Sequence, residues 1–168
     1  MAEDSRDHAR EVKVGIAQWK VAKAPYRLIT LGLGSCVGVA LYDRQARVGG
    51  MAHVMLPDSS QFANQHNPAK FADTALPALL EEMLRWGAGR QRLVAKLAGG
   101  AQMFNSQGGG PLLNIGPRNV AAVKETLQQL GIPVSGEDCG GSMGRTMILD
   151  TETGAVYIRA IGRPVRSL

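Results

Sequence analysis

Residues 32–43 read GLGSCVGVALYD, and a second β-prone run follows at residues 48–56. A short polar segment separates the two runs, which is typical of a β-hairpin. With a two-residue turn closed by Asp43 and Ala46, Cys36 lies directly opposite His53. Opposed residues in an antiparallel pair point to the same face of the sheet, so this register predicts a thiol and an imidazole side by side.

The two faces of this hairpin differ in bulk. Val37, Val39 and Leu41 fall on one face, which is apolar enough to pack on a core. The other face places Cys36 with Gly38 and Ala40. Because these neighbours are small, we expect an open face on which a large substrate group can approach the cysteine.

The rest of the chain adds strands and two helices. Apolar spacing predicts one helix around residues 75–84 and a second from Pro117 to a cap at Gly131. Further strands are predicted at residues 12–18, 26–31, 93–98, 132–137, 146–150 and 155–161. Two helices among strands linked mostly by hairpins indicate an α+β fold with mixed or antiparallel sheets.

Length and composition indicate one domain. We expect a flexible lead-in at residues 1–11, a single domain at 12–162 and a basic tail at 163–168 of the 168-residue chain. The charged N-terminus lacks a secretory signal, and no apolar run reaches the ~20 residues of a membrane span, so we expect a cytoplasmic protein without membrane insertion. The net charge is +5, but the basic residues are scattered, which does not predict nucleic-acid binding.

The predicted pair suits acyl transfer to sulfur followed by hydrolysis. A neighbouring imidazole can take the proton of a thiol and stabilise the thiolate. Backbone N–H groups of the turn at Gly34 and Ser35 can face a developing oxyanion. Thr30, at the end of the preceding strand, offers a hydroxyl that can orient His53.

Other interpretations of these residues remain open from sequence reasoning. Cys36 also fits a small buried hydrophobe, and His53 a strand residue satisfied by a carbonyl. The G-x-C-x-G spacing matches a hydrolase elbow, but such an elbow leads into a helix and a strand is predicted here. Together with His66 and Cys139 these residues lack zinc-ligand spacing, so we predict neither metal nor cofactor, and both cysteines as thiols.

The segments TLGLGSCVGVALYD (residues 30–43) and VGGMAHVMLPDS (residues 48–59) resemble the CheD family of chemoreceptor glutamine deamidases. The resemblance continues through KFADTALPALLEEM, AKLAGGAQMF, NIGPRNV and EDCGG, and it covers nearly all of residues 12–161. It implies a β-sandwich flanked by helices, similar to the catalytic domain of the cytotoxic-necrotizing-factor toxins.

The resemblance also implies an activity and partners. It assigns Cys36, His53 and Thr30 to a site that converts receptor glutamines to glutamate through a cysteine thioester, with receptor methylesterase activity in some members. The implied partners are the helical cytoplasmic region of chemoreceptors and a CheC-type phosphatase, which the segment at Met103 and Phe104 is expected to contact. The alternative is a non-catalytic adaptor that regulates such a phosphatase or the receptor array by binding.

Overall fold

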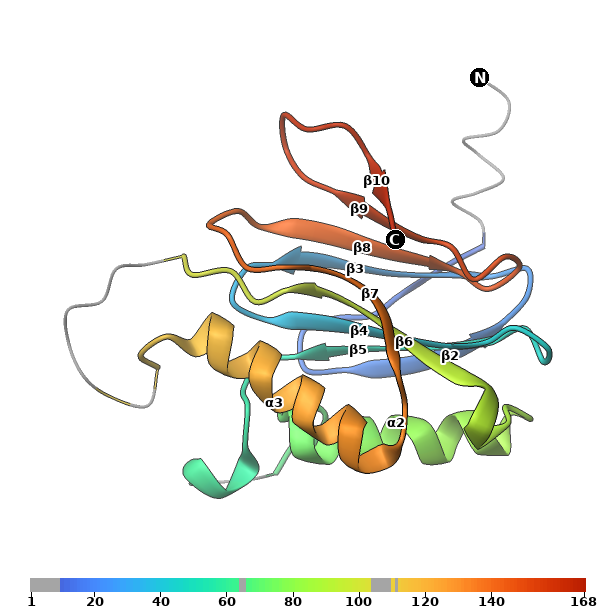
Figure 1. Ribbon diagram of the computed structural model, residues 1–168, viewed down its shortest axis with the longest axis horizontal. Helices are drawn as coiled ribbons and strands as arrows, with labels where there is room; N and C mark the ends of the chain where they lie inside the picture. Colours follow the sequence, from blue (N-terminus) through green and yellow to red (C-terminus); the bar gives the residue numbers. More distant parts are fainter. Residues whose placement is uncertain (1–9, 64–65, 104–109, 111) are drawn as a thin grey trace.

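The computed structural model describes residues 10–63, 66–103, 110 and 112–168. Two five-stranded sheets pack face to face, and two helices cover the outer face of one of them (Figure 1). The expected α+β fold with mixed sheets is confirmed.

The sheet without helices has the strand order β1-β3-β8-β9-β10. β1 and β3 run parallel, and the other neighbours are antiparallel. Its strands are β1 (Glu11–Lys13), β3 (Arg27–Leu33), β8 (Arg145–Asp150), β9 (Val156–Arg159) and β10 (Arg166–Ser167). The last of these pairs residues of the expected basic tail with β9.

The helix-covered sheet has the order β2-β5-β4-β6-β7. β6 and β7 run parallel and the other neighbours are antiparallel. Its strands are β2 (Trp19–Lys23), β4 (Val37–Asp43), β5 (Val48–Val54), β6 (Leu93–Gly99) and β7 (Val134–Cys139). β4 and β5, the predicted hairpin, thus form the middle of this sheet.

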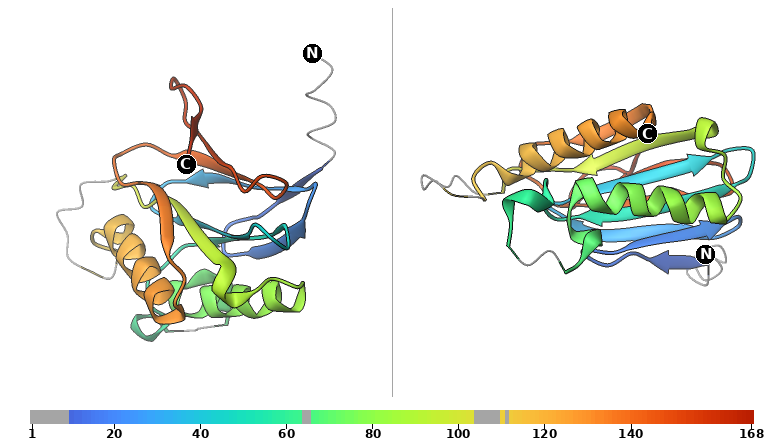
Figure 2. Two further views of the ribbon diagram at one scale, coloured as in Figure 1. Left: turned by 45° about the vertical axis from the view of Figure 1, so that its right-hand side comes forward. Right: turned by 90° about the horizontal axis from the view of Figure 1, so that it is seen from below.

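The helices are α2 (Ala72–Arg85) and α3 (Ile115–Leu130), with short 3-10 turns η1 (Ser59–Gln61), η2 (Pro68–Lys70) and η3 (Arg90–Arg92). They lie beside each other across the sheet (Figure 2). Val37, Val39 and Leu41 pack under them, as their face of the hairpin predicts. Gly131 ends α3 in the left-handed conformation that favours glycine, as predicted. No helix in the described ranges is both long and apolar enough to cross a membrane.

The face of the hairpin that carries Gly38 is not open, which corrects the sequence-based expectation. Every residue of β4 and β5 is buried, and this face lies against the second sheet. A Cβ on Gly38 would lie 2.8 Å from Met147 Sδ and 2.9 Å from Leu33 Cδ1. The small residues therefore make room for side chains of the opposite sheet, and access to Cys36 comes from elsewhere.

The predicted hairpin register is also wrong by two residues. Gly38, and not Cys36, lies opposite His53, because Asp43 pairs with Val48 and leaves four residues in the turn. The Asp43 carboxylate accepts the N–H groups of Gln45 (2.9 Å) and Ala46 (3.1 Å), which stabilises this longer turn. A shift of two residues preserves the face, so Cys36 becomes a diagonal neighbour of His53.

The strand expected at residues 12–18 is wrong for most of its length, because β1 covers only its first two residues and the next strand, β2, begins after it in the other sheet. β1 ends at Lys13, and after a turn the chain re-emerges as β2 beside β5. Ala17 in this turn has a positive φ of 56°. Alanine gives no turn signal, but Gly15 in the same turn does, and its N–H donates to Gln18 Oε1 (2.9 Å).

Candidate active site

Cys36 lies at the turn that leads from β3 into β4, and main-chain hydrogen bonds hold this turn on both sides. The Gly34 carbonyl accepts from Ala101 N and the Cys36 carbonyl accepts from Gly100 N, each at 2.8 Å. Gly99 must be glycine, since it has a φ of 102° and a Cβ there would collide with the Cys36 carbonyl. The residues that follow β6 thus fix the position of the nucleophile candidate.

A cavity of about 340 Å³ opens beside the thiol. It is lined by Ser35, Cys36, Met55, Leu56, Ala101, Gln102, Met103, Leu112, Asn114, Ile115 and Gly116. None of these lining residues is charged, so the cavity suits a neutral side chain. Met103, one of the two predicted partner-contact residues, is 42 % exposed here, and Phe104 lies outside the described residues.

Thr30 and His53 are joined by a hydrogen bond, as the sequence analysis anticipated. Thr30 Oγ1 lies 2.7 Å from His53 Nδ1 and 2.7 Å from the carbonyl oxygen of Val14. The carbonyl can only accept, so the single hydroxyl proton of Thr30 goes to it. Thr30 Oγ1 must then accept from His53 Nδ1–H, which assigns the tautomer and leaves Nε2 with a free lone pair.

His53 Nε2 is buried and has no hydrogen-bond partner among the described residues. Burial lowers the pKa of His53 to about 4, so the imidazole is neutral near pH 7 and can accept a proton. The diagonal relation puts the residues about 7–8 Å apart along the sheet, a span that an imidazole can bridge. Nε2 is therefore a free base on the same face as Cys36.

The thiol is also neutral at rest. Burial raises the pKa of Cys36, and its own backbone N–H acts in the opposite direction but more weakly. A pair of neutral groups, thiol and imidazole, differs from a preformed thiolate–imidazolium pair.

Of the two residues predicted to supply oxyanion donors, Gly34 already donates its N–H to the Gly32 carbonyl (3.0 Å), so Ser35 remains, and the Cys36 N–H lies next to it on the same turn. The N–H groups of Ser35 and Cys36 donate to no other residue in the part of the chain that the structure describes. The peptide of Gly34 and Ser35 is held through its carbonyl by Ala101 N. Since a peptide is planar, this contact sets the direction of the Ser35 N–H as well.

The second cysteine does not share these features. Cys139 ends β7 beside Gly99, and burial raises the pKa of its thiol to about 11. Neither cysteine forms a disulfide. Within the described residues, no three His, Cys, Asp or Glu side chains lie together as a candidate metal site.

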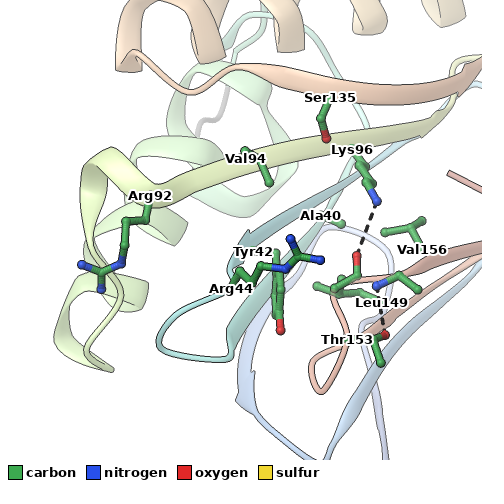
Figure 3. Close-up of a pocket in the computed structure, with 12 residues that line it drawn as sticks. Ala40, Tyr42, Arg44, Arg92, Val94, Lys96, Ser135, Leu149, Thr153 and Val156 are labelled. Carbon is green, nitrogen blue, oxygen red and sulfur yellow. Dashed lines mark hydrogen bonds between the residues drawn. The ribbon is translucent and has the colours of Figure 1, made fainter.

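A second cavity, of about 400 Å³, lies between the sheets at the other end of β4 (Figure 3). Tyr42, Arg44 and Lys96 line it, and Lys96 Nζ donates to the carbonyl oxygens of Gly154 (3.5 Å) and Leu168 (2.6 Å). It holds neither a thiol nor an imidazole, so it lacks the groups of the Cys36 site.

A cysteine on a glycine-rich turn, with a neutral histidine whose tautomer a third residue holds, is the arrangement of a cysteine-dependent hydrolase. Comparison with known proteins identifies the family. The family model described as CheD chemotactic sensory transduction matches residues 55–160. The chain belongs to the CheD family.

Three relatives align with this chain over nearly the whole length of both proteins. A probable chemoreceptor glutamine deamidase CheD from Moorella thermoacetica is 62 % identical over 158 residues, covering 94 % of this chain and 95 % of its own. Those of Desulforamulus reducens (56 % identical; 93 % and 94 % covered) and Clostridium kluyveri (51 %; 95 % and 98 %) carry the same name. The family model begins after Thr30, Cys36 and His53.

Proposed function

We propose that this protein is a chemoreceptor glutamine deamidase, which hydrolyses receptor glutamine side chains to glutamate and ammonia. The observation that carries the proposal is the Thr30–His53 hydrogen bond of 2.7 Å, which leaves a buried free base on the face of Cys36. The names of its close relatives support the substrate class.

In the first half-reaction, Cys36 Sγ attacks the carboxamide carbon of the glutamine, and His53 Nε2 takes the thiol proton. The carbonyl oxygen becomes an oxyanion and accepts from the N–H groups of Ser35 and Cys36. The intermediate collapses as His53 returns the proton to the leaving nitrogen. Ammonia departs, and a γ-glutamyl thioester remains on sulfur.

In the second half-reaction, His53 Nε2 takes a proton from water, which attacks the thioester carbon. The C–S bond breaks, sulfur regains the proton and a glutamate side chain is released. A glutamyl methyl ester enters the same sequence with methanol as the leaving group. Receptor methylesterase activity is therefore part of the proposal.

The cavity beside Cys36 supports a neutral substrate. Its lining residues carry no charge and include the apolar side chains of Met55, Met103 and Leu112. Burying a glutamine amide there costs much less solvation free energy than burying a glutamate carboxylate, which would have no counter-charge among the lining residues. This difference favours entry of the substrate and release of the product.

We further propose where the receptor and a second partner bind. A receptor helix presents the glutamine at the cavity mouth, where Met103 contacts it. The same surface suits a CheC-type phosphatase, and the fold is proposed to resemble the toxin deamidase domain named above. Such a substrate places the protein in the cytoplasm.

The test is mass spectrometry of a receptor cytoplasmic fragment incubated with the protein, with Cys36→Ala or with Cys139→Ser. We expect the wild type and Cys139→Ser to add about 1 Da at particular glutamines, and Cys36→Ala to leave them unchanged. Conversion of these glutamines by Cys36→Ala would refute the role of Cys36 as the nucleophile. Binding of the fragment without conversion by any of the three proteins would favour the adaptor.

A further inference from the structure

Two buried side-chain polar atoms in the described part of the chain lack a hydrogen-bond partner: His53 Nε2 and Asn119 Oδ1. The first is the free base. The second belongs to a fully buried residue of α3 that the sequence analysis did not single out. Leaving such an atom unpaired costs about 1–3 kcal/mol, so Asn119 is not optimised for stability alone.

The other end of the Asn119 side chain joins two parts of the site. Its Nδ2 donates to the carbonyl oxygen of Ser35 and to that of Met55, each at 2.9 Å. Both partners are carbonyls that only accept, which assigns the amide orientation and leaves Oδ1 on the opposite side. One side chain therefore links the residue before Cys36 to a residue two positions after His53.

The Ser35 carbonyl and the Cys36 N–H belong to one planar peptide and point in opposite directions. We propose that Asn119 is a positioning residue: by holding the Ser35 carbonyl, it aims the Cys36 N–H at the oxyanion. Because it also holds the Met55 carbonyl, Asn119 fixes the position of the turn that carries Cys36 relative to the end of β5, the strand of His53. This role deepens the proposed deamidase activity and rests on it for one of its two readouts.

The neighbouring peptides do not depend on a side chain. Main-chain N–H groups of Ala101 and Gly100 hold the carbonyls of Gly34 and Cys36. The peptide between Ser35 and Cys36 is held by Asn119, so one substitution can release it, together with the Met55 carbonyl, while the two flanking peptides of the turn stay held. The Cys36 N–H also lowers the pKa of the thiol against the larger effect of burial, so its release would leave the thiol less acidic.

Close packing of the helix brings Asn119 within reach. Gly116, in the first turn of α3, lies so close to the preceding loop that a Cβ would collide with the Ala101 carbonyl. A Cβ on Gly100 would in turn collide with Val120. The helix thus packs on main chain at its first turn, which sets the depth of Asn119 in the site.

The test compares Asn119→Ala with Thr126→Ala. Thr126 is a buried residue of the same helix whose hydroxyl donates to the Ala122 carbonyl (2.8 Å), so its loss perturbs α3 without touching the Cys36 turn. Each protein is treated with iodoacetamide from pH 6 to 10, and peptide mapping follows the alkylation of Cys36. Cys139 serves as an internal reference.

For Asn119→Ala we expect slower alkylation of Cys36 near pH 7 and a pH midpoint shifted upward. With a receptor fragment we expect kcat to fall about 10²-fold, the cost of a misplaced oxyanion donor, while KM stays within about twofold. Thr126→Ala should match the wild type in both measurements. These shifts separate positioning from general loss of stability.

Alkylation of Cys36 in Asn119→Ala with the wild-type pH profile would overturn the proposal, whatever the substrate. If the wild type converted no receptor glutamine, the deamidase proposal would fail, and the alkylation profile would still decide the role of Asn119. Should Asn119→Ala not fold, Asn119→Leu takes its place. Leucine is close to asparagine in size, carries no charge and donates neither hydrogen bond, so we expect the same shift, and its absence would again refute the role.

Discussion

Replacing Thr30 by valine tests whether the threonine sets the state of the histidine. Valine matches threonine in shape but removes the hydroxyl that donates to the Val14 carbonyl and accepts from His53 Nδ1–H. The Nδ1–H tautomer then has a buried donor without a partner, which costs about 1–3 kcal/mol. Without a partner for Nδ1–H, the imidazole is no longer held in the tautomer and ring orientation that leave Nε2 free towards Cys36, and either another orientation or a proton on Nε2 removes the base.

The size of the effect follows from this penalty. At about 1.4 kcal/mol for each factor of ten, losing about 1–3 kcal/mol of stabilisation lowers the active combination of tautomer and ring orientation to between about a fifth and a hundredth of its wild-type population. We expect kcat for deamidation to fall about 5- to 100-fold in Thr30→Val. Thr30→Ser keeps the hydroxyl and should retain kcat within about threefold.

Nitrogen-15 NMR of the imidazole reports the tautomer of His53, and a deamidation assay on a receptor fragment gives kcat. The wild type should give an Nδ1–H tautomer, and Thr30→Val a mixture or an Nε2–H tautomer. Wild-type kcat in a folded Thr30→Val protein would refute the argument, as would an Nε2–H tautomer in the wild type.

Four further predictions concern the same region. Because burial lowers the pKa of His53 to about 4, the acid limb of kcat should fall only as pH drops toward 4, and a limb near 6.5 would contradict a buried base. The unfolded histidine protonates near its usual value, so the free energy of unfolding should also decrease from about pH 6.5 downward, as thermal melts at several pH values would report. Gly38→Ala should lower the free energy of unfolding by about 1–3 kcal/mol in urea, because the added Cβ would collide with Met147 and Leu33. An unchanged urea midpoint would mean that the two sheets can move apart at this point without loss of stability. Cys139→Ser should keep wild-type kcat, because the Cys139 thiol of the wild type has a pKa of about 11 and lies outside the cavity. Loss of turnover in a folded Cys139→Ser protein would mean that Cys139 takes part in the reaction.

Local sequence pattern predicted the hairpin and the shared face of Cys36 and His53. Strand periodicity is a property of adjacent residues, so the face was recovered even though the register was wrong by two. The register itself depends on Asp43, which is fully buried and also accepts from Gly89 N and the Arg92 guanidinium. Those partners lie more than forty residues away, so the hairpin sequence could not reveal the longer turn.

The small residues beside Cys36 led to the wrong surface for a similar reason. Small side chains predict a space but not what fills it, and here Leu33 and Met147 of the opposite sheet fill it. The actual approach to the thiol is the cavity that Met55, Met103 and Leu112 line. These residues come from separate segments that only the folded chain brings together.

Residue types and strand alternation are enough to establish which groups are available for chemistry and on which face of the hairpin the thiol and the imidazole lie. The tertiary structure decided their chemical state. The Val14 carbonyl takes the Thr30 proton and so assigns the His53 tautomer, and burial between the sheets keeps both thiol and imidazole neutral. Asn119 reaches Ser35 from 84 residues away. A proton position or a peptide orientation depends on every neighbour in space, whereas alternation along a strand depends only on neighbours in sequence.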